Sequence, residues 1–182
     1  IKIFIFFFLF MKSNFFFAQN VQSPAECLGY TLGTKYTPHD KIVAYFNAVA
    51  QAVPGMVKVE KYGETNEGRP LIVAYIASTE NLQNLDAIRM NNLRLAGIAK
   101  DKMAPVLQGS PAICWLSYNV HGNEPTSSEA AMQTLYALVD PSNTQTKAWL
   151  KNHVEIIDPC LNPEGRDRDV NCDNEGVGKT LK

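Results

Sequence analysis

Residues 112–125 read AICWLSYNVHGNEP, a short apolar run followed by a turn that carries a histidine and a glutamate. The apolar run is rich in aromatic and branched residues and is bounded by turn residues, which predicts a strand buried on both faces. His121 and Glu124 leave the carboxyl end of this strand. Ligands of an open α/β sheet lie outside the carboxyl ends of its strands, so we expect a functional site at these two residues.

The pair formed by His121 and Glu124 is chemically suited to zinc. A neutral imidazole nitrogen and a carboxylate oxygen are both good zinc ligands, and a spacing of three residues across a turn can direct them at one ion. By spacing alone, a hydrogen-bonded surface pair is the commoner arrangement. The tight Gly122-Asn123 turn favours the metal, because it holds both side chains with little entropy left to lose on binding.

Helical and strand patterns lie on both sides of this stretch. Residues 19–36 have no clear period and are expected to form an N-terminal loop segment. Apolar residues at helical spacing predict helices over residues 37–53, 81–100 and 126–139 and a short helical turn over residues 146–152. Strand patterns predict a hairpin of residues 57–62 and 71–77 and a buried strand over residues 154–158.

Polar residues at two helix starts are expected to have structural roles. Thr37 is expected to cap the first helix, and His39 in its first turn is expected to face solvent and to bind no metal. Residues 126–129 read TSSE, which fits a capping box in which the Glu129 side chain bonds the backbone at the start of the helix. Glu129 is therefore not a candidate for catalysis.

Composition is that of one ordinary globular domain. The 182 residues are 46% hydrophobic and 19% charged, with a net charge of -1. No basic stripe that could follow phosphates is present, so no nucleic-acid partner is expected. The four cysteines form no C-x-x-C pair and are expected to be unpaired, as small buried residues or exposed thiols: Cys27, Cys114, Cys160 and Cys172.

Residues 1–18 are expected to be a secretory signal peptide that lies outside the domain. Lys2 precedes an apolar block over residues 3–10, and a second block, FFFA, ends at Ala18. A membrane anchor is the alternative, but an uninterrupted span of about 20 apolar residues is not present, so no stable membrane span is expected. Export would place the protein in the periplasm or outside the cell.

Three blocks of sequence, in this order, resemble the zinc carboxypeptidase family of carboxypeptidase A-like metallopeptidases. They are EGRPL at residues 67–71, HGNE at residues 121–124 and NPEG at residues 162–165. The resemblance spans residues 37–168 and implies a three-layer α/β sandwich around a mixed sheet. It implies that residues 37–182 are the N-terminal portion of such a domain. It also implies a single Zn²⁺, with His121 and Glu124 as its first two ligands.

By resemblance, the reaction is hydrolysis of the C-terminal peptide bond of a peptide or protein with a free C-terminus. In such a reaction zinc activates a water and polarises the carbonyl, a glutamate acts as general base, and arginines bind the terminal carboxylate. Arg166 and Arg168 are the candidates for substrate binding. The alternative for both is a surface ion pair with Asp167 or Asp169.

Part of the family's machinery is not found in this sequence. The other histidines are His39, in the first turn of a helix, and His153, at the wrong end of a strand, so neither is expected to complete a zinc site. A third ligand and the general-base glutamate are expected beyond Lys182. The chain is therefore expected to be an inactive fragment with uncovered strand edges, with weak zinc binding and with no catalytic residue of its own.

Two other functions are compatible with the same residues. The first is a secreted relative that keeps the fold as a non-catalytic binding surface. The second is a zinc deacylase that acts on small N-acyl amino acids. The block at residues 67–69 favours the peptidase over both.

Overall fold

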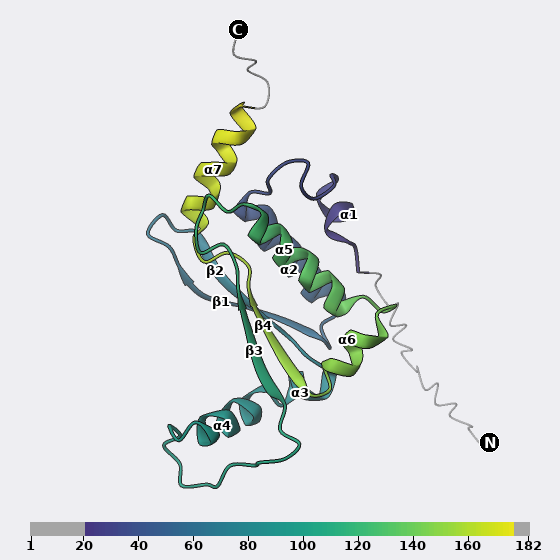
Figure 1. The fold of residues 1–182 in the computed structure, drawn as a ribbon, viewed down its shortest axis with the longest axis vertical. Coiled ribbons are helices and arrows are strands. Elements are labelled where there is room, and N and C mark those ends of the chain that lie inside the picture. The colour runs from purple at the N-terminus through teal and green to yellow at the C-terminus, as the bar shows by residue number, and fades with distance from the viewer. Residues whose placement is uncertain (1–20, 177–182) are drawn as a thin grey trace, which may run out of the picture.

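A computed structural model describes residues 21–176, and its centre is a mixed four-stranded sheet (Figure 1). The strands are β1 (Val57–Glu64), β2 (Pro70–Ile76), β3 (Ala112–Ser117) and β4 (His153–Asp158), in the spatial order β1-β2-β4-β3. β1 and β2 form the predicted antiparallel hairpin, and β2 pairs antiparallel with β4. β3 and β4 run parallel. The sequence preceding Val21, which includes the predicted signal peptide, lies outside the described residues, so export stays a prediction.

Seven helices accompany the sheet in residues 21–176. They are α1 (Pro24–Leu28), α2 (His39–Ala52), α3 (Thr79–Gln83), α4 (Leu85–Leu95), α5 (Thr126–Val139), α6 (Thr144–Trp149) and α7 (Pro163–Gly176). α2 and α5 lie side by side against one face of the sheet (Figure 1). None of the helices in these residues is long and apolar enough to cross a membrane.

Two apolar cores lie on opposite faces of the sheet, because alternate strand residues point to opposite sides. The larger core joins α2 and α5 to one face, with Phe46 and Leu135 among its buried residues. On β2, Ile72 belongs to this core and Val73 to the smaller one, which packs against Ile88 of α4. The predicted α/β fold, with helices on both faces of a mixed sheet, is confirmed.

The prediction that residues 112–117 are buried on both faces is wrong. β3 is the last strand of the sheet in residues 21–176 and has only β4 beside it. As a result Ile113 is 37% exposed and Trp115 is 60% exposed. β4 lies between β2 and β3 and is mostly buried, as predicted. The apolar pattern correctly identified both strands. Whether the side chains of a strand are buried, however, depends on neighbouring elements that the sequence of the strand does not reveal.

Other differences concern helix boundaries. The predicted helix over residues 81–100 is two helices, α3 and α4, separated at Asn84, and it ends at Leu95. α1 lies in the expected loop segment, where Ser23 and Glu26 form a capping box. α7 occupies residues for which no helix was predicted; Asn162, just before it, accepts a bond from the Gly165 N–H at 3.0 Å.

His39 was predicted to face solvent, and this is wrong. The side chain is 2% exposed, and its Nε2 lies 2.8 Å from the carbonyl oxygen of Pro70. The backbone N–H of His39 donates to Asp167 of α7 at 2.9 Å. Pro38 is the residue before α2, and Thr37 does not cap the helix. Instead the hydroxyl of Thr37 accepts a bond from Tyr30.

The predicted capping box at Glu129 is also absent, because α5 has no side-chain cap at its start. Glu129 is buried and forms an ion pair with the buried Arg166 of α7, with 2.7 Å between Oε1 and Nη2. The same Oε1 accepts the backbone N–H of Thr37 at 2.7 Å. Arg166 also donates to the carbonyl oxygens of Thr37, at 2.9 Å, and of Pro125. This ion pair joins α7, α5 and the segment before α2.

The turn after β3 and the turn after β4 touch through two glycines. A Cβ atom built on Gly122 would overlap the backbone of Gly165. A Cβ atom on Gly165 would in turn lie 2.7 Å from the side-chain nitrogen of Asn162. No flexible side chain can give way at Gly122, so the two backbones touch only because this residue is glycine.

Gly122→Ala is expected to destabilise the protein. Because the added methyl group meets backbone, the free energy of unfolding should fall by about 1–3 kcal/mol, the usual cost of overpacking, or by more. Urea unfolding measures this change. Gly63→Ala is the matched control, since its Cβ would meet only Leu71 Cδ1 at 3.8 Å. Equal stability of the two variants would contradict the close contact.

Glu129→Ala is expected to be more harmful than the loss of a surface charge. It leaves the guanidinium of Arg166 buried without a counterion, which costs about 3–5 kcal/mol in comparable pairs. The control is Glu64→Ala, which removes an exposed partner of Lys61 and should change the free energy of unfolding much less. Similar losses in the two variants, measured by urea unfolding, would show that the buried pair has no special role.

Candidate metal centre

His121 and Glu124 lie in a short turn between β3 and α5. The backbone N–H of Glu124 donates to the carbonyl oxygen of His121 at 3.1 Å, which closes the turn. The N–H of Ser127 then donates to the carbonyl oxygen of Glu124 at 3.1 Å, as α5 begins. Both candidate side chains are exposed. The structure therefore places them on one turn at the carboxyl end of β3, where the sequence predicted them.

The NPEG block at residues 162–165 lies against the same turn. β3 and β4 pair in parallel with Ser117 opposite Asp158, so their carboxyl ends meet at one edge of the sheet. Beyond the strands, the N–H of Leu161 donates to the carbonyl oxygen of Tyr118 at 3.0 Å, and that of Asn162 donates to Asn119 at 3.1 Å. Backbone bonds thus join the segment that leads into the NPEG block to the segment that leads into the HGNE block.

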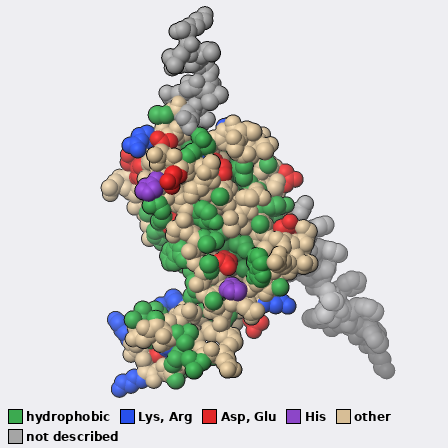
Figure 2. Space-filling model, in the orientation of Figure 1, with side chains coloured by type: hydrophobic (Ala, Val, Ile, Leu, Met, Phe, Trp, Pro, Cys, Tyr) green, Lys and Arg blue, Asp and Glu red, His purple; other side chains and the backbone are tan. Residues whose placement is uncertain are grey.

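The third block, at residues 67–71, reaches the same place from the β1–β2 hairpin. The Nε of Arg69 donates to Asp167 of α7 at 2.8 Å, and its Nη1 donates to Glu67. The hairpin loop and the segment from Asn162 into α7 line a polar groove of about 490 Å³, formed by Glu67, Arg69, Asn162, Glu164, Gly165, Asp167, Arg168 and Asn171. Figure 2 shows acidic, basic and histidine side chains gathered at this end of the sheet, around the start of α7.

The two arginines predicted to bind substrate have different surroundings. Arg168 is exposed and lines the polar groove, and its predicted partner Asp167 is occupied by Arg69. Arg166 is fully buried, and its guanidinium is bonded to protein groups on three sides. A substrate contact by Arg166 therefore has no support in this arrangement.

Burial and hydrogen bonds set the charges around the site. Burial raises the pKa of Asp158, while the hydroxyl of Tyr62, which donates to its Oδ2 at 2.6 Å, acts in the opposite direction. Burial raises the pKa of the Cys160 thiol to about 12, so this group stays protonated at neutral pH. A hydrogen bond from Thr65 lowers the pKa of Glu164 in the polar groove. The groove thus keeps a charged carboxylate, whereas the buried thiol beneath the turn is neutral.

The residues present fit zinc in donor type but not in number. A catalytic zinc has three protein ligands and one open position, and no cluster of three His, Cys, Asp or Glu side chains suited to a metal lies in residues 21–176. His39 is buried against Pro70. His153 pairs with Ala112 at the start of β3, which is the opposite end of the sheet from His121. The described residues therefore contain two candidate ligands, His121 and Glu124, and no third candidate beside them.

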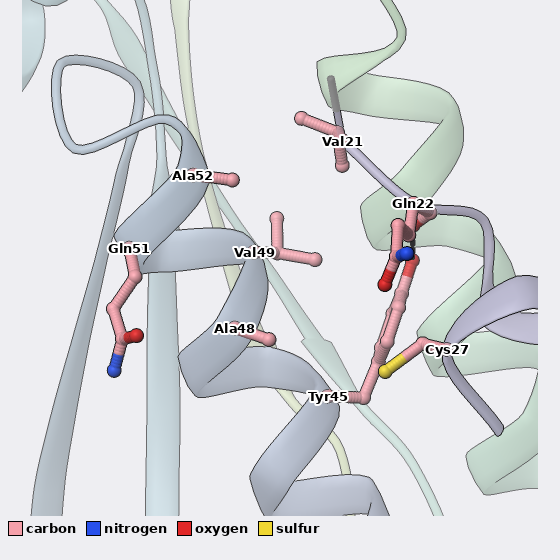
Figure 3. A pocket seen from close by; sticks show the side chains of 8 residues that line it. All are labelled: Val21, Gln22, Cys27, Tyr45, Ala48, Val49, Gln51 and Ala52. Atoms are coloured by element: carbon pink, nitrogen blue, oxygen red, sulfur yellow. Dashed lines mark hydrogen bonds between the residues drawn. The ribbon is translucent and has the colours of Figure 1, made fainter. Parts of the chain in front are cut away.

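A second hollow, of about 420 Å³, lies between α2 and the chain around α1 (Figure 3). The hydroxyl of Tyr45 points across it and donates to the carbonyl oxygen of Gln22 at 3.2 Å. Its other lining residues are Val21, Cys27, Ala48, Val49, Gln51 and Ala52. With neither a histidine nor a carboxylate in its lining, this hollow is not a candidate metal site.

Comparison with known proteins identifies the family of this chain. The sequence model of the family described as zinc carboxypeptidase matches residues 42–178. The carboxypeptidase A from Helicoverpa armigera is similar in structure, with a TM-score of 0.54 at 19% identity over 78% of this chain. Thrombin activatable fibrinolysis inhibitor has a TM-score of 0.54 at 17% identity over 74% of this chain.

At these identities the similarity to solved structures concerns the fold alone. This chain covers 30% of the Helicoverpa armigera structure and 27% of the fibrinolysis inhibitor, so it spans less than a third of either. The family model, in contrast, matches most of the chain and extends over the segments that build the turn and the polar groove. The chain therefore belongs to the zinc carboxypeptidase family.

Proposed function

We propose that the complete protein is a zinc-dependent metallocarboxypeptidase and that His121 and Glu124 are two of its zinc ligands. The observation that carries this proposal is the convergence of three sequence blocks at one edge of the sheet, in a chain that belongs to the zinc carboxypeptidase family. The proposal includes a third zinc ligand and a general-base glutamate supplied by sequence after Lys182. The substrate is a peptide or protein with a free C-terminus.

The exposed turn suits a ligand pair that must leave room for a substrate. When bound, zinc lowers the pKa of a coordinated water and polarises the scissile carbonyl. The His121 imidazole and the Glu124 carboxylate would hold the ion, and both belong to the same exposed turn.

Arg168 is the residue that we propose for the substrate's terminal carboxylate. Its side chain is exposed in the polar groove, beside the Asn162–Gly165 turn that touches the candidate metal turn. A guanidinium matches the two oxygens of a carboxylate with parallel hydrogen bonds. Arg69, the other arginine of the groove, is already bonded to Glu67 and Asp167.

His121→Ala in the complete protein is expected to remove zinc and peptidase activity together. Zinc affinity should fall by more than about 100-fold, because the loss of a ligand exceeds the effect of losing a group that only orients one. Metal analysis after dialysis and hydrolysis of a C-terminal peptide bond measure both effects. His153→Ala is the control, since it lies at the opposite end of the sheet.

The outcomes of this experiment also separate the other functions. Equal zinc content in His121→Ala and in the wild type would overturn the proposal. Absence of zinc from the wild-type protein would favour a non-catalytic binding protein. Zinc-dependent hydrolysis of N-acyl amino acids, without hydrolysis of peptides, would favour a deacylase.

Arg168→Ala is expected to weaken substrate binding more than the chemical step. Each lost hydrogen bond to a charged group corresponds to about 1.5–3 kcal/mol, so loss of the paired bonds should raise KM by at least about 10-fold. Steady-state kinetics with a peptide substrate measure this rise. Arg94→Ala removes an arginine that pairs with Asp101 beside α4 and should leave KM unchanged. An unchanged KM in Arg168→Ala would exclude the proposed contact.

A further inference from the structure

Asn119 connects β3 to the turn that carries His121 and Glu124, and its backbone is unusual. It is 1% exposed, and in residues 21–176 it is the one non-glycine residue with a positive φ, +54°. This conformation brings Cβ close to the following carbonyl oxygen, and asparagine is among the few residue types that tolerate it. The strand therefore ends, and the turn begins, at a residue with a specific conformational requirement.

The side-chain amide of Asn119 holds the turn from the inside. Its Nδ2 donates to the carbonyl oxygen of His121 at 3.0 Å and to that of Glu124 at 3.3 Å. A primary amide nitrogen carries two hydrogens, so one group satisfies both carbonyls. Both bonds go to the backbone of the two residues that we propose as zinc ligands.

The other polar atoms of Asn119 are bonded to neighbouring segments. Its backbone N–H donates to Ser127 Oγ of α5 at 2.8 Å, and its carbonyl oxygen accepts the N–H of Asn162 at 3.1 Å. Its Oδ1 accepts a bond from the thiol of Cys160 at 3.0 Å. The amide is therefore held in one orientation by groups from α5 and from the segment that follows β4.

The candidate ligands themselves are not restrained through their side chains. Both side chains are exposed, and no hydrogen bond from residues 21–176 to either imidazole or carboxylate is observed. Metal ligands are usually oriented by bonds to groups outside the coordination sphere. Here the orienting bonds are made to the backbone of His121 and Glu124, and Asn119 makes two of them.

We infer that Asn119 is a positioning residue, whose buried amide fixes the backbone of His121 and Glu124 so that both side chains can reach one ion. The inference rests on the proposed function, since it takes these two residues as zinc ligands. Asparagine meets both requirements of the position, because it tolerates the left-handed backbone and provides two donors. Glycine would keep the backbone conformation and lose both bonds.

Asn119→Gly in the complete protein tests this role. Zinc affinity, measured by competition with a chromogenic chelator, should fall about 10- to 100-fold, the range for groups that orient metal ligands. With Co²⁺ in place of zinc, the visible absorption spectrum should change, since it reports ligand geometry and not stability.

The matched control is Asn81→Gly. Asn81 is another buried asparagine whose Nδ2 donates to two carbonyl oxygens, of Leu150 and Lys151, each at 3.0 Å. These residues lie near the start of β4, at the opposite end of the sheet. Asn81→Gly should lower Tm but leave the zinc affinity and the Co²⁺ spectrum as in the wild type.

The results that would overturn the inference differ from those that would overturn the proposed function. Wild-type zinc affinity in Asn119→Gly, combined with lost binding in His121→Ala, would exclude the positioning role alone. Equal zinc binding by the wild type and His121→Ala would overturn both. If Asn119→Gly does not fold, Cys160→Ala removes the donor to Oδ1 and should weaken zinc binding about 2- to 10-fold, the effect of one hydrogen bond. Unchanged binding in that variant would overturn the inference.

Discussion

Gly122 and Gly165 meet at a separation that leaves no space for a side chain on Gly122, and the candidate site depends on this contact. Parallel pairing of Ser117 with Asp158 brings the turns after β3 and β4 to the same edge of the sheet. Glycine then allows the two backbones to close on each other. The HGNE and NPEG blocks, far apart in the sequence, are therefore one structural unit. A shift of either turn would move the candidate ligands relative to the polar groove.

The buried ion pair behind this unit has a different role from a surface salt bridge. Arg166, Glu129 and the backbone of Thr37 form a closed ring of hydrogen bonds, in which Thr37 donates to Glu129 and accepts from Arg166. Burial of two charges has a large desolvation cost, which good geometry only offsets. The ring joins α7 and the segment before α2 to α5.

The sequence predicted the strands and most helices because their patterns are local. It did not predict the exposure of β3, since Ile113 and Trp115 are apolar whether or not a neighbour covers them. From the sequence, Glu129 was expected to cap a helix and Arg166 to bind the substrate. Their buried ion pair was not predicted, because two residues distant in sequence leave no local pattern. His39 was misplaced for the same reason, as its partners are Pro70 and Asp167. Asn119 follows the end of β3, and an asparagine at such a position is a local sign of a left-handed backbone. This sign was not used to predict the turn.

The candidate metal turn shows how a site can be partly formed in advance. The two candidate ligands are exposed on one turn, and no third donor is placed beside them in residues 21–176. The backbone of that turn is nevertheless fixed by Asn119, by the N–H of Glu124 and by contact with Gly165. The backbone of the turn would therefore lose little further conformational freedom on binding a metal. The backbone of the two candidate ligands is thus ordered before any metal binds, and only their exposed side chains remain to be ordered.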